Sequence, residues 1–212
     1  MLDSKLATKL LFATAALSAL GFGVLSFAVA RGKTSRFDRR AKRRVHGLRV
    51  DSEHPQALRN VALGTTPLGK WWAYLPPSLV AARRLQRQGR TAAALSVAGA
   101  AVAAALMPPL LDRLLEQRSP PPERGEPAKQ SYPSGHALQT SAVALTTSYV
   151  LMREGLAPRW SAAPWGLASL AAGAGRLVLD RHWTSDLVGG YFAGIALGAT
   201  CAGLYELSAH GG

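Results

Sequence analysis

A chain of 212 residues is long enough for one globular domain or one small membrane bundle. Its formal net charge of +13 would suit a nucleic-acid binder. However, the sequence has no nucleic-acid fold signature and no basic stripe interleaved with aromatic residues, so we expect no nucleic-acid partner. The single cysteine excludes an intramolecular disulfide and a thiolate metal cluster.

The charges are segregated between long apolar runs, which favours a membrane protein. Leu10 to Ala30, Thr91 to Leu111 and Leu187 to Tyr205 carry no formal charge. Each run approaches the roughly 20 residues that cross a hydrocarbon core as a helix. Together with weaker apolar stretches, they predict an all-α fold, an integral membrane bundle of six helices.

Charge and hydropathy divide the chain into four segments. They are a first transmembrane helix at 1–30, a basic amphipathic or loop segment at 31–60, a core of five transmembrane helices at 61–207, and a tail at 208–212. Ala28-Val29-Ala30 also fits a signal-peptidase site, so the first segment is either an uncleaved helix or a signal peptide. We favour the helix, because the apolar stretch is long for a signal peptide.

The basic segment carries eight Lys or Arg residues between Arg31 and Arg44. Apolar residues recur within it at helical spacing, namely Phe37, Ala41, Val45 and Leu48. This pattern fits either a short amphipathic helix on the lipid headgroups or a solvated loop. In both cases we expect contact with anionic membrane lipids.

The basic loop from Arg83 to Arg90 belongs in the cytoplasm by the positive-inside rule. Counting helices from there places the loops before Ser134 and Thr184 on the outer face, which we expect to be that of a bacterial inner membrane. If Val61 to Ala82 crosses the membrane, the same count places the basic segment 31–60 on the outer face, which conflicts with the positive-inside rule. Either that stretch does not cross, or the basic segment contacts the outer headgroups.

A first candidate motif reads Tyr132-Pro133-Ser134-Gly135-His136 and precedes an apolar helical run. Ser134 is suited to cap that helix, whose first N–H groups can bind an anion. Gly135 lacks the Cβ that would hold a phosphate away from those donors. His136, in the first turn, can give a proton to a departing alkoxide.

A second motif supplies the complementary groups. Arg176 offers a planar fork of donors that fits phosphate oxygens, and it lies at the end of an apolar segment, where it needs an anionic partner or water. His182 and Asp186 are four residues apart, so they share a face if the helix begins early. A carboxylate on one imidazole nitrogen leaves the other nitrogen free to attack.

The two motifs together resemble the second and third signature motifs of the type 2 phosphatidic acid phosphatase superfamily, over roughly residues 61–207. That resemblance implies that His182 is the nucleophile that forms a phosphohistidine. It implies that Asp186 orients His182, that His136 is the general acid, and that Arg176, Ser134 and Gly135 bind phosphate. Neither motif supplies a cluster of carboxylates, so we expect no metal and no cofactor.

The first motif of that family, a lysine several residues before an Arg-Pro pair, is altered here. The corresponding stretch, from Leu111 to Pro120, has no lysine and places Ser119 between the arginine and the proline. We expect Arg118 to replace the motif arginine and Arg113 to stand in for the lysine in phosphate binding. In alternative registers, Asp112 or Leu111 occupies the lysine position. Lys129 is a second candidate for the lysine.

The sequence therefore predicts a membrane lipid phosphate phosphatase that acts on a phosphomonoester or a terminal pyrophosphate. The alternative is a non-catalytic protein of the same fold that binds phosphorylated lipid headgroups, and the missing lysine favours it. A third interpretation, a basic membrane adaptor acting through Arg31 to Arg59, would leave both motifs without a role. The sequence carries no signal for an oligomeric state.

Overall fold

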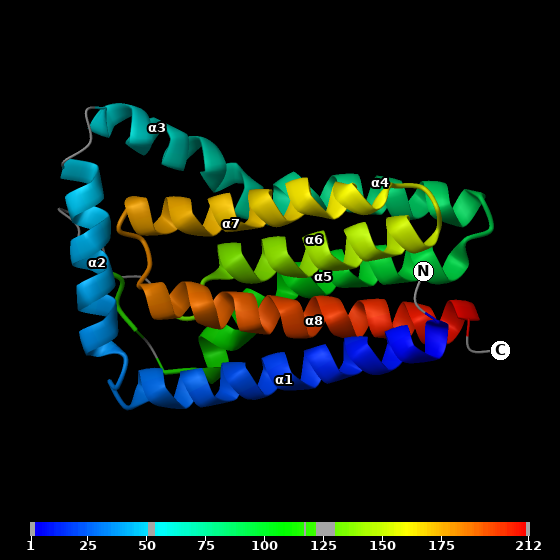
Figure 1. Cartoon of the computed structure of the whole chain (residues 1–212), viewed down its shortest axis with the longest axis horizontal. Helices are drawn as coiled ribbons and strands as arrows, with labels where there is room; N and C mark the ends of the chain where they lie inside the picture. Colours follow the sequence, from blue (N-terminus) through cyan, green and yellow to red (C-terminus); the bar gives the residue numbers. More distant parts are fainter. Residues whose placement is uncertain (1–2, 51–53, 117, 122–129, 211–212) are drawn as a thin grey trace.

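The computed structural model describes residues 3–50, 54–116, 118–121 and 130–210, which form helices and no strands (Figure 1). The α-helices, in chain order, are α1 (Ser4–Ala30), α2 (Ser35–Val50), α3 (Pro55–Thr65), α4 (Trp71–Arg87), α5 (Thr91–Leu114), α6 (Gly135–Arg153), α7 (Ala162–Val178) and α8 (Thr184–His210). Two short 3₁₀ helices, η1 (Thr66–Gly69) and η2 (Arg159–Ser161), precede α4 and α7.

The helices α1 and α4 to α8 lie side by side along the long axis of the molecule, and both termini lie at one end (Figure 1). Of the described helices, α1, α5 and α8 are long and apolar enough to cross a membrane. The predicted all-α bundle of an integral membrane protein is confirmed. The expected count of six describes the helices along the long axis, and α2 and α3 add two more at one end.

The stretch from Val61 to Ala82, expected to be one span, is instead divided among α3, η1 and α4. Pro67 lacks the N–H that would continue the hydrogen bonds of α3, and Lys70 is extended, with φ −103° and ψ 137°. The chain therefore makes a tight turn at η1, which contacts α6 and α7. This turn becomes part of the site described below.

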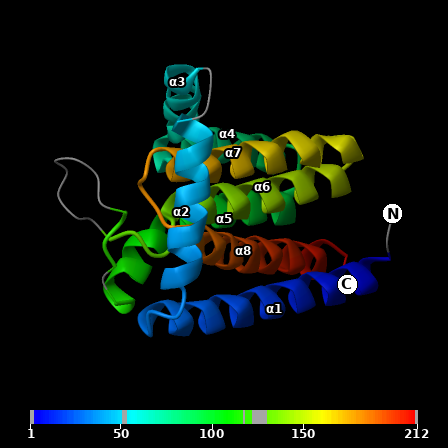
Figure 2. The same cartoon turned by 60° about the vertical axis from the view of Figure 1, so that its left-hand side comes forward.

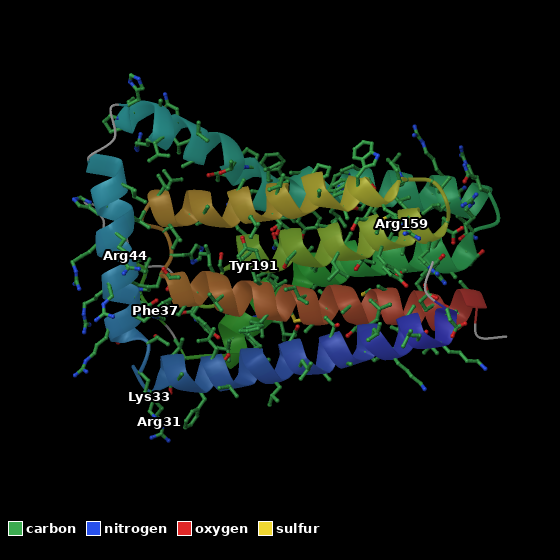
Figure 3. All side chains as sticks on the ribbon, viewed as in Figure 1. Arg31, Lys33, Phe37, Arg44, Arg159 and Tyr191 are labelled. Carbon is green, nitrogen blue, oxygen red and sulfur yellow. The ribbon has the colours of Figure 1, made fainter. Side chains whose placement is uncertain are left out.

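Helix α2 crosses the end of the bundle that lies opposite the termini (Figures 1 and 2). Its exposed arginines include Arg36, Arg40 and Arg44. Figure 3 shows many of its basic side chains pointing away from the bundle. Two residues attach α2 to the bundle. Asp38 is 1% exposed, and the ammonium of Lys42 lies 3.4 Å from Asp180. The helical part of the basic segment therefore lies at the end where α6 and α8 begin.

Small residues let α8 pack closely against α6. Gly190, Gly194 and Gly198 recur every four residues along α8. A Cβ at Gly190 would collide with the backbone oxygen of Ser134, and one at Gly198 would lie 2.9 Å from the backbone oxygen of Ala142. This close approach positions the first turn of α6 beside the first turn of α8.

Replacing Gly194 with leucine is expected to destabilise the bundle by about 1–3 kcal/mol or more, the usual cost of overpacking a core. A Cβ there collides with Ser141 Oγ and with the backbone oxygen of Leu138, which cannot move without separating α6 from α8. Thermal unfolding in detergent measures the effect. The control is Gly99→Leu in α5, where a Cβ meets nothing within 4 Å. Equal melting temperatures for the two variants would contradict this packing.

Candidate active site

The two sequence motifs are joined through their backbones at the end of the bundle near α2. The Ser134 N–H donates to the backbone carbonyl of Asp186 at 2.9 Å. His182 Nδ1 lies 2.8 Å from the backbone carbonyl of Ser131. Residues about fifty positions apart in the sequence therefore form one local structure.

The hydrogen bond at Nδ1 fixes the state of His182. A carbonyl oxygen can only accept, so Nδ1 must carry the hydrogen, and in the neutral ring Nε2 keeps its lone pair. The side chain of His182 is only 10% exposed, which restricts its orientation. His182 thus has the tautomer that a nitrogen nucleophile needs, and the Ser131 carbonyl selects it.

Asp186 lies close to His182, but its oxygens are engaged elsewhere. Its fully buried carboxylate accepts from the Trp183 N–H at 2.7 Å and from Arg118 Nη1 at 2.7 Å. The distance from Asp186 Oδ2 to His182 Nδ1 is 3.6 Å, longer than a hydrogen bond. Helix α8 begins only at Thr184, so His182 precedes the helix whose face it was expected to share.

Arg118 connects α8 to α2. Its Nη1 donates to Asp186 Oδ1 and to Ser185 Oγ, both at 2.7 Å, and its Nη2 donates to Asp38 Oδ2 at 2.7 Å. The other Asp38 oxygen accepts from the Ser185 N–H at 2.9 Å. Three of the five N–H donors of this guanidinium are thus directed at protein groups. Arg118 acts here as an ionic link between two buried carboxylates.

The first turn of α6 has the features expected of an anion-binding helix end. Ser134 is fully buried and its Oγ accepts from the Ala137 N–H at 3.5 Å, which completes the predicted N-cap. The Ser134 N–H is already bonded to α8, so it is not free for a ligand. The next N–H groups, those of Gly135 and His136, have no partner among the residues that the structure describes. They are the donors that remain for an anion.

His136 is 8% exposed and packs against η1. A Cβ on Gly69 would collide with its imidazole ring, so only glycine allows this contact. The backbone of Thr66 hydrogen-bonds to the ring, while Nε2 is buried and has no hydrogen-bond partner among the described residues. A buried nitrogen without a partner is costly unless a ligand completes it.

Arg176 lies in the last turn of α7, and its Nε is buried. The preceding Gly175 allows close packing, because a Cβ there would collide with Thr65 Oγ1 and lie 3.0 Å from the Ala62 carbonyl oxygen. The positive charges of Arg176 and Lys70 act on the His136 ring, as does that of His182 when its ring is protonated. Arg176, His136 and His182 therefore share one electrostatic environment.

The loop before α6 is held by α1. The Tyr132 hydroxyl lies 2.9 Å from Ser26 Oγ, and the Tyr132 ring fills the space where a Cβ on Gly189 would be. Burial raises the pKa of the Tyr132 phenol, so the hydroxyl stays protonated. Helix α1 thus supports the loop that carries the Ser131 carbonyl.

One of the expected phosphate-binding residues, Arg113, is not brought to this cluster. Arg113, in the last turn of α5, is exposed and has no ionic partner within the described part of the chain. Lys129 lies outside the described residues. No group of three His, Cys, Asp or Glu side chains that could hold a metal ion occurs in the described ranges.

Sequence reasoning missed three groups at the site. Asp38 is the only acidic residue from Arg31 to Val50, a signal that could have marked it. Lys70 is likewise the only charged residue from Val61 to Ala82. The Ser131 carbonyl had no signal, because a backbone acceptor is invisible in sequence.

A family model described as the PAP2 superfamily matches residues 9–208. The fold also resembles a crystal structure described as the first transmembrane PAP2 type phosphatidylglycerolphosphate phosphatase from Bacillus subtilis, with a TM-score of 0.73 and 20% sequence identity. That superposition covers 89% of this chain and 94% of the other. A comparison with curated proteins gave no significant match. Because the family model matches nearly the whole chain, this protein belongs to the PAP2 superfamily.

Proposed function

We propose that this protein is a membrane lipid phosphate phosphatase that works through a phosphohistidine on His182. One observation carries the proposal. His182, with its hydrogen on Nδ1, shares a cationic environment with His136, whose Nε2 is buried and unpartnered within the described structure. A nucleophile and a proton donor on either side of a phosphoryl group account for both features.

In the first step, His182 Nε2 attacks phosphorus, and the bond from phosphorus to the lipid oxygen breaks. Burial and the nearby positive charge of Arg176 lower the pKa of His136 to about 3, so the negative charge of the bound phosphate has to hold the proton on Nε2. His136 donates that proton to the departing oxygen, so that the lipid leaves as an alcohol or, from a diphosphate, as the monophosphate. Arg176 and the free N–H groups of α6 stabilise the negative charge on the transferring phosphoryl oxygens. The Ser131 carbonyl stabilises the Nδ1–H of His182 as its ring becomes positive.

In the second step, water attacks the phosphohistidine, and the phosphorus–nitrogen bond breaks. His136 removes the proton from the attacking water, which returns it to its starting protonation state. Phosphate leaves and His182 regains its lone pair. Asp186 contributes negative charge 3.6 Å from Nδ1 and favours the positively charged ring during both steps.

An apolar groove next to the site supports a lipid as the substrate. The groove has a volume of about 280 Å³ and runs between α4, α6 and α7. Leu68 and Thr140 line it, and they lie close in sequence to Lys70 and His136. In contrast, the cavity between α2 and His182 measures only about 10 Å³. A headgroup near His136 could therefore continue into an acyl chain in the groove, and we place the site at the outer face of a bacterial inner membrane.

A second candidate function is the binding of phosphorylated lipid headgroups without hydrolysis. This function is favoured by the altered first motif. Arg118 is bonded to two carboxylates, and Arg113 is exposed. Against it, a binding protein has no need for a histidine held in its nucleophilic tautomer. We therefore prefer hydrolysis.

Phosphate release from a panel of lipid phosphates by the purified protein tests the choice. The panel should contain phosphatidate, phosphatidylglycerol phosphate, a polyprenyl phosphate and a polyprenyl diphosphate. We expect at least one to be hydrolysed by the wild type and not by His182→Ala. Saturable binding of these lipids without phosphate release would favour the binding function instead.

Activity is expected to be unchanged when divalent metals are removed. The proposed mechanism draws its positive charge from Arg176 and from helix N–H groups, and neither motif supplies a cluster of carboxylates. Assays with excess EDTA and assays with added Mg²⁺ should agree within about twofold, a difference of under 1 kcal/mol in the barrier. Complete loss in EDTA, restored by Mg²⁺, would contradict the metal-free mechanism.

A further inference from the structure

Lys70 is a single charge in an otherwise uncharged stretch, and the fold places it at the turn between η1 and α4. Its side chain is exposed, and its ammonium has no ionic or hydrogen-bond partner among the residues that the structure describes. An exposed lysine alone does not indicate a function. The packing around Lys70 and the charges near it indicate one.

The turn that carries Lys70 packs against residues of both histidine motifs. On one side, Gly69 packs against the His136 ring, and the Thr66 backbone hydrogen-bonds to that ring. On the other side, Thr65 packs against Gly175, directly before Arg176. The backbone of this turn is therefore fixed relative to both histidine motifs.

The charge of Lys70 adds to other positive charges around the His136 ring. Lys70 and Arg176 act on that ring, as does His182 when its own ring is protonated. Asp186 lies 3.6 Å from His182 and offsets part of this charge. A phosphate group with two negative charges, bound beside His136, would be attracted by the positive charge that remains.

The other candidate cations are less well placed to bind phosphate. Arg118 directs three N–H groups at Asp186, Ser185 and Asp38. Arg113 is exposed on the last turn of α5. Among the lysines that the structure describes, Lys70 is the one whose positive charge acts on the His136 ring.

We propose that Lys70 is a phosphate-binding residue of this active site, and that its ammonium contacts the phosphoryl oxygens of the lipid phosphate beside Arg176. This inference rests on the proposed function. It assigns the cationic role left open by the altered first motif to a residue that precedes that motif by some forty positions and comes from a different element. Leu68 and Ala73, which flank Lys70, line the apolar groove, so Lys70 lies where a headgroup would meet its acyl chain.

The test compares Lys70→Met with Lys70→Arg and with Lys33→Met. Methionine keeps the apolar stem and removes the charge, and Lys33 is an exposed lysine at the same end of the molecule (Figure 3). Its variant matches the loss of net charge at the membrane surface. We expect Lys70→Met to lower kcat/KM by about 10- to 100-fold, the effect of losing a hydrogen bond to a charged group. The inhibition constant for inorganic phosphate should rise by a similar factor.

Lys70→Arg should recover part of the loss, whereas Lys33→Met should stay within about twofold of the wild type, as surface substitutions usually do. Unchanged kcat/KM and phosphate inhibition in Lys70→Met would overturn the inference while leaving the proposed function intact. If that variant does not fold, amine-reactive labelling of the wild type replaces it. Inorganic phosphate should protect Lys70 but not Lys33, and equal labelling of Lys70 with and without phosphate would overturn the inference.

Failure of the proposed function gives a different result. The wild type would then hydrolyse none of the lipid phosphates, and His182→Ala would behave like the wild type. In that case, stabilisation by inorganic phosphate in thermal unfolding still tests Lys70. Stabilisation of the wild type but not of Lys70→Met would support phosphate binding at Lys70, and equal stabilisation of both would refute it.

Discussion

His182→Ala is expected to abolish lipid phosphate hydrolysis, with kcat falling by a factor on the order of 10⁴ or more, as when other enzymes lose their nucleophile. The loss is large because the proposed covalent intermediate forms on His182 Nε2. His182 Nδ1 already donates to the Ser131 carbonyl, so its Nε2 is ready to attack without rearrangement. Phosphate release from the best substrate of the panel measures the effect.

His54→Ala provides the matched control. His54 is exposed at the start of α3, so its loss should leave turnover within about twofold of the wild type. A phosphoenzyme trapped from labelled substrate should be labile in acid and stable in alkali, as a phosphoramidate is, and should be absent from His182→Ala. Full turnover in His182→Ala would remove His182 as the nucleophile.

Arg118→Ala is expected to lower the free energy of unfolding by about 3 kcal/mol, the lower end of the cost of breaking a buried ion pair, because the guanidinium keeps 18% exposure. The change leaves Asp38 and Asp186, at 1% and 0% exposure, without their shared cation. Asp186 would then reorient beside His182, so kcat should fall as well. Thermal unfolding in detergent and steady-state kinetics measure the two effects.

A second variant separates the ionic link from phosphate binding. Adding Asp38→Asn to Arg118→Ala removes one unpaired carboxylate and keeps an amide that can bond to Ser185, so part of the lost stability should return. Arg113→Ala, five residues away and exposed, should change stability by no more than about 0.5 kcal/mol. If Arg118→Ala instead raised KM at unchanged stability, Arg118 would be a phosphate ligand and not a link. A loss of activity in Arg113→Ala would instead support the expectation that Arg113 replaces the motif lysine.

The histidine motifs could be recognised from sequence because their chemistry depends on residue type and spacing. Ser134 precedes a helix whose first turn carries His136, and the structure has that N-cap and that helix. The geometry between the motifs could not be predicted. Asp186 was expected to orient His182. Its carboxylate lies 3.6 Å from His182 Nδ1 and bonds to Trp183 and Arg118, while the Ser131 carbonyl lies within hydrogen-bond distance of the ring.

The membrane-bundle fold was predictable because hydropathy alone reports long apolar helices. Uncharged runs in α1, α5 and α8 are visible in the sequence, and so is the four-residue glycine repeat of α8. The stretch around Lys70 was not predictable in the same way. Its mean hydropathy suggested one span, whereas Pro67 and the packing of η1 against α6 and α7 divide it.

The sequence by itself determined the class of fold, the end of each helix at which the histidines lie, and the chemistry that those histidines can perform. These depend on local composition, on capping and on side-chain type. Only the tertiary structure decided which distant groups lie near the two histidine motifs, namely Asp38 on α2, the Ser131 carbonyl and Lys70 on the turn after η1. Their positions depend on helix packing, since glycines on α8, at Gly69 and at Gly175 allow backbones to approach closely enough for these groups to meet. A local sequence pattern does not specify which helix backbones will pack against each other.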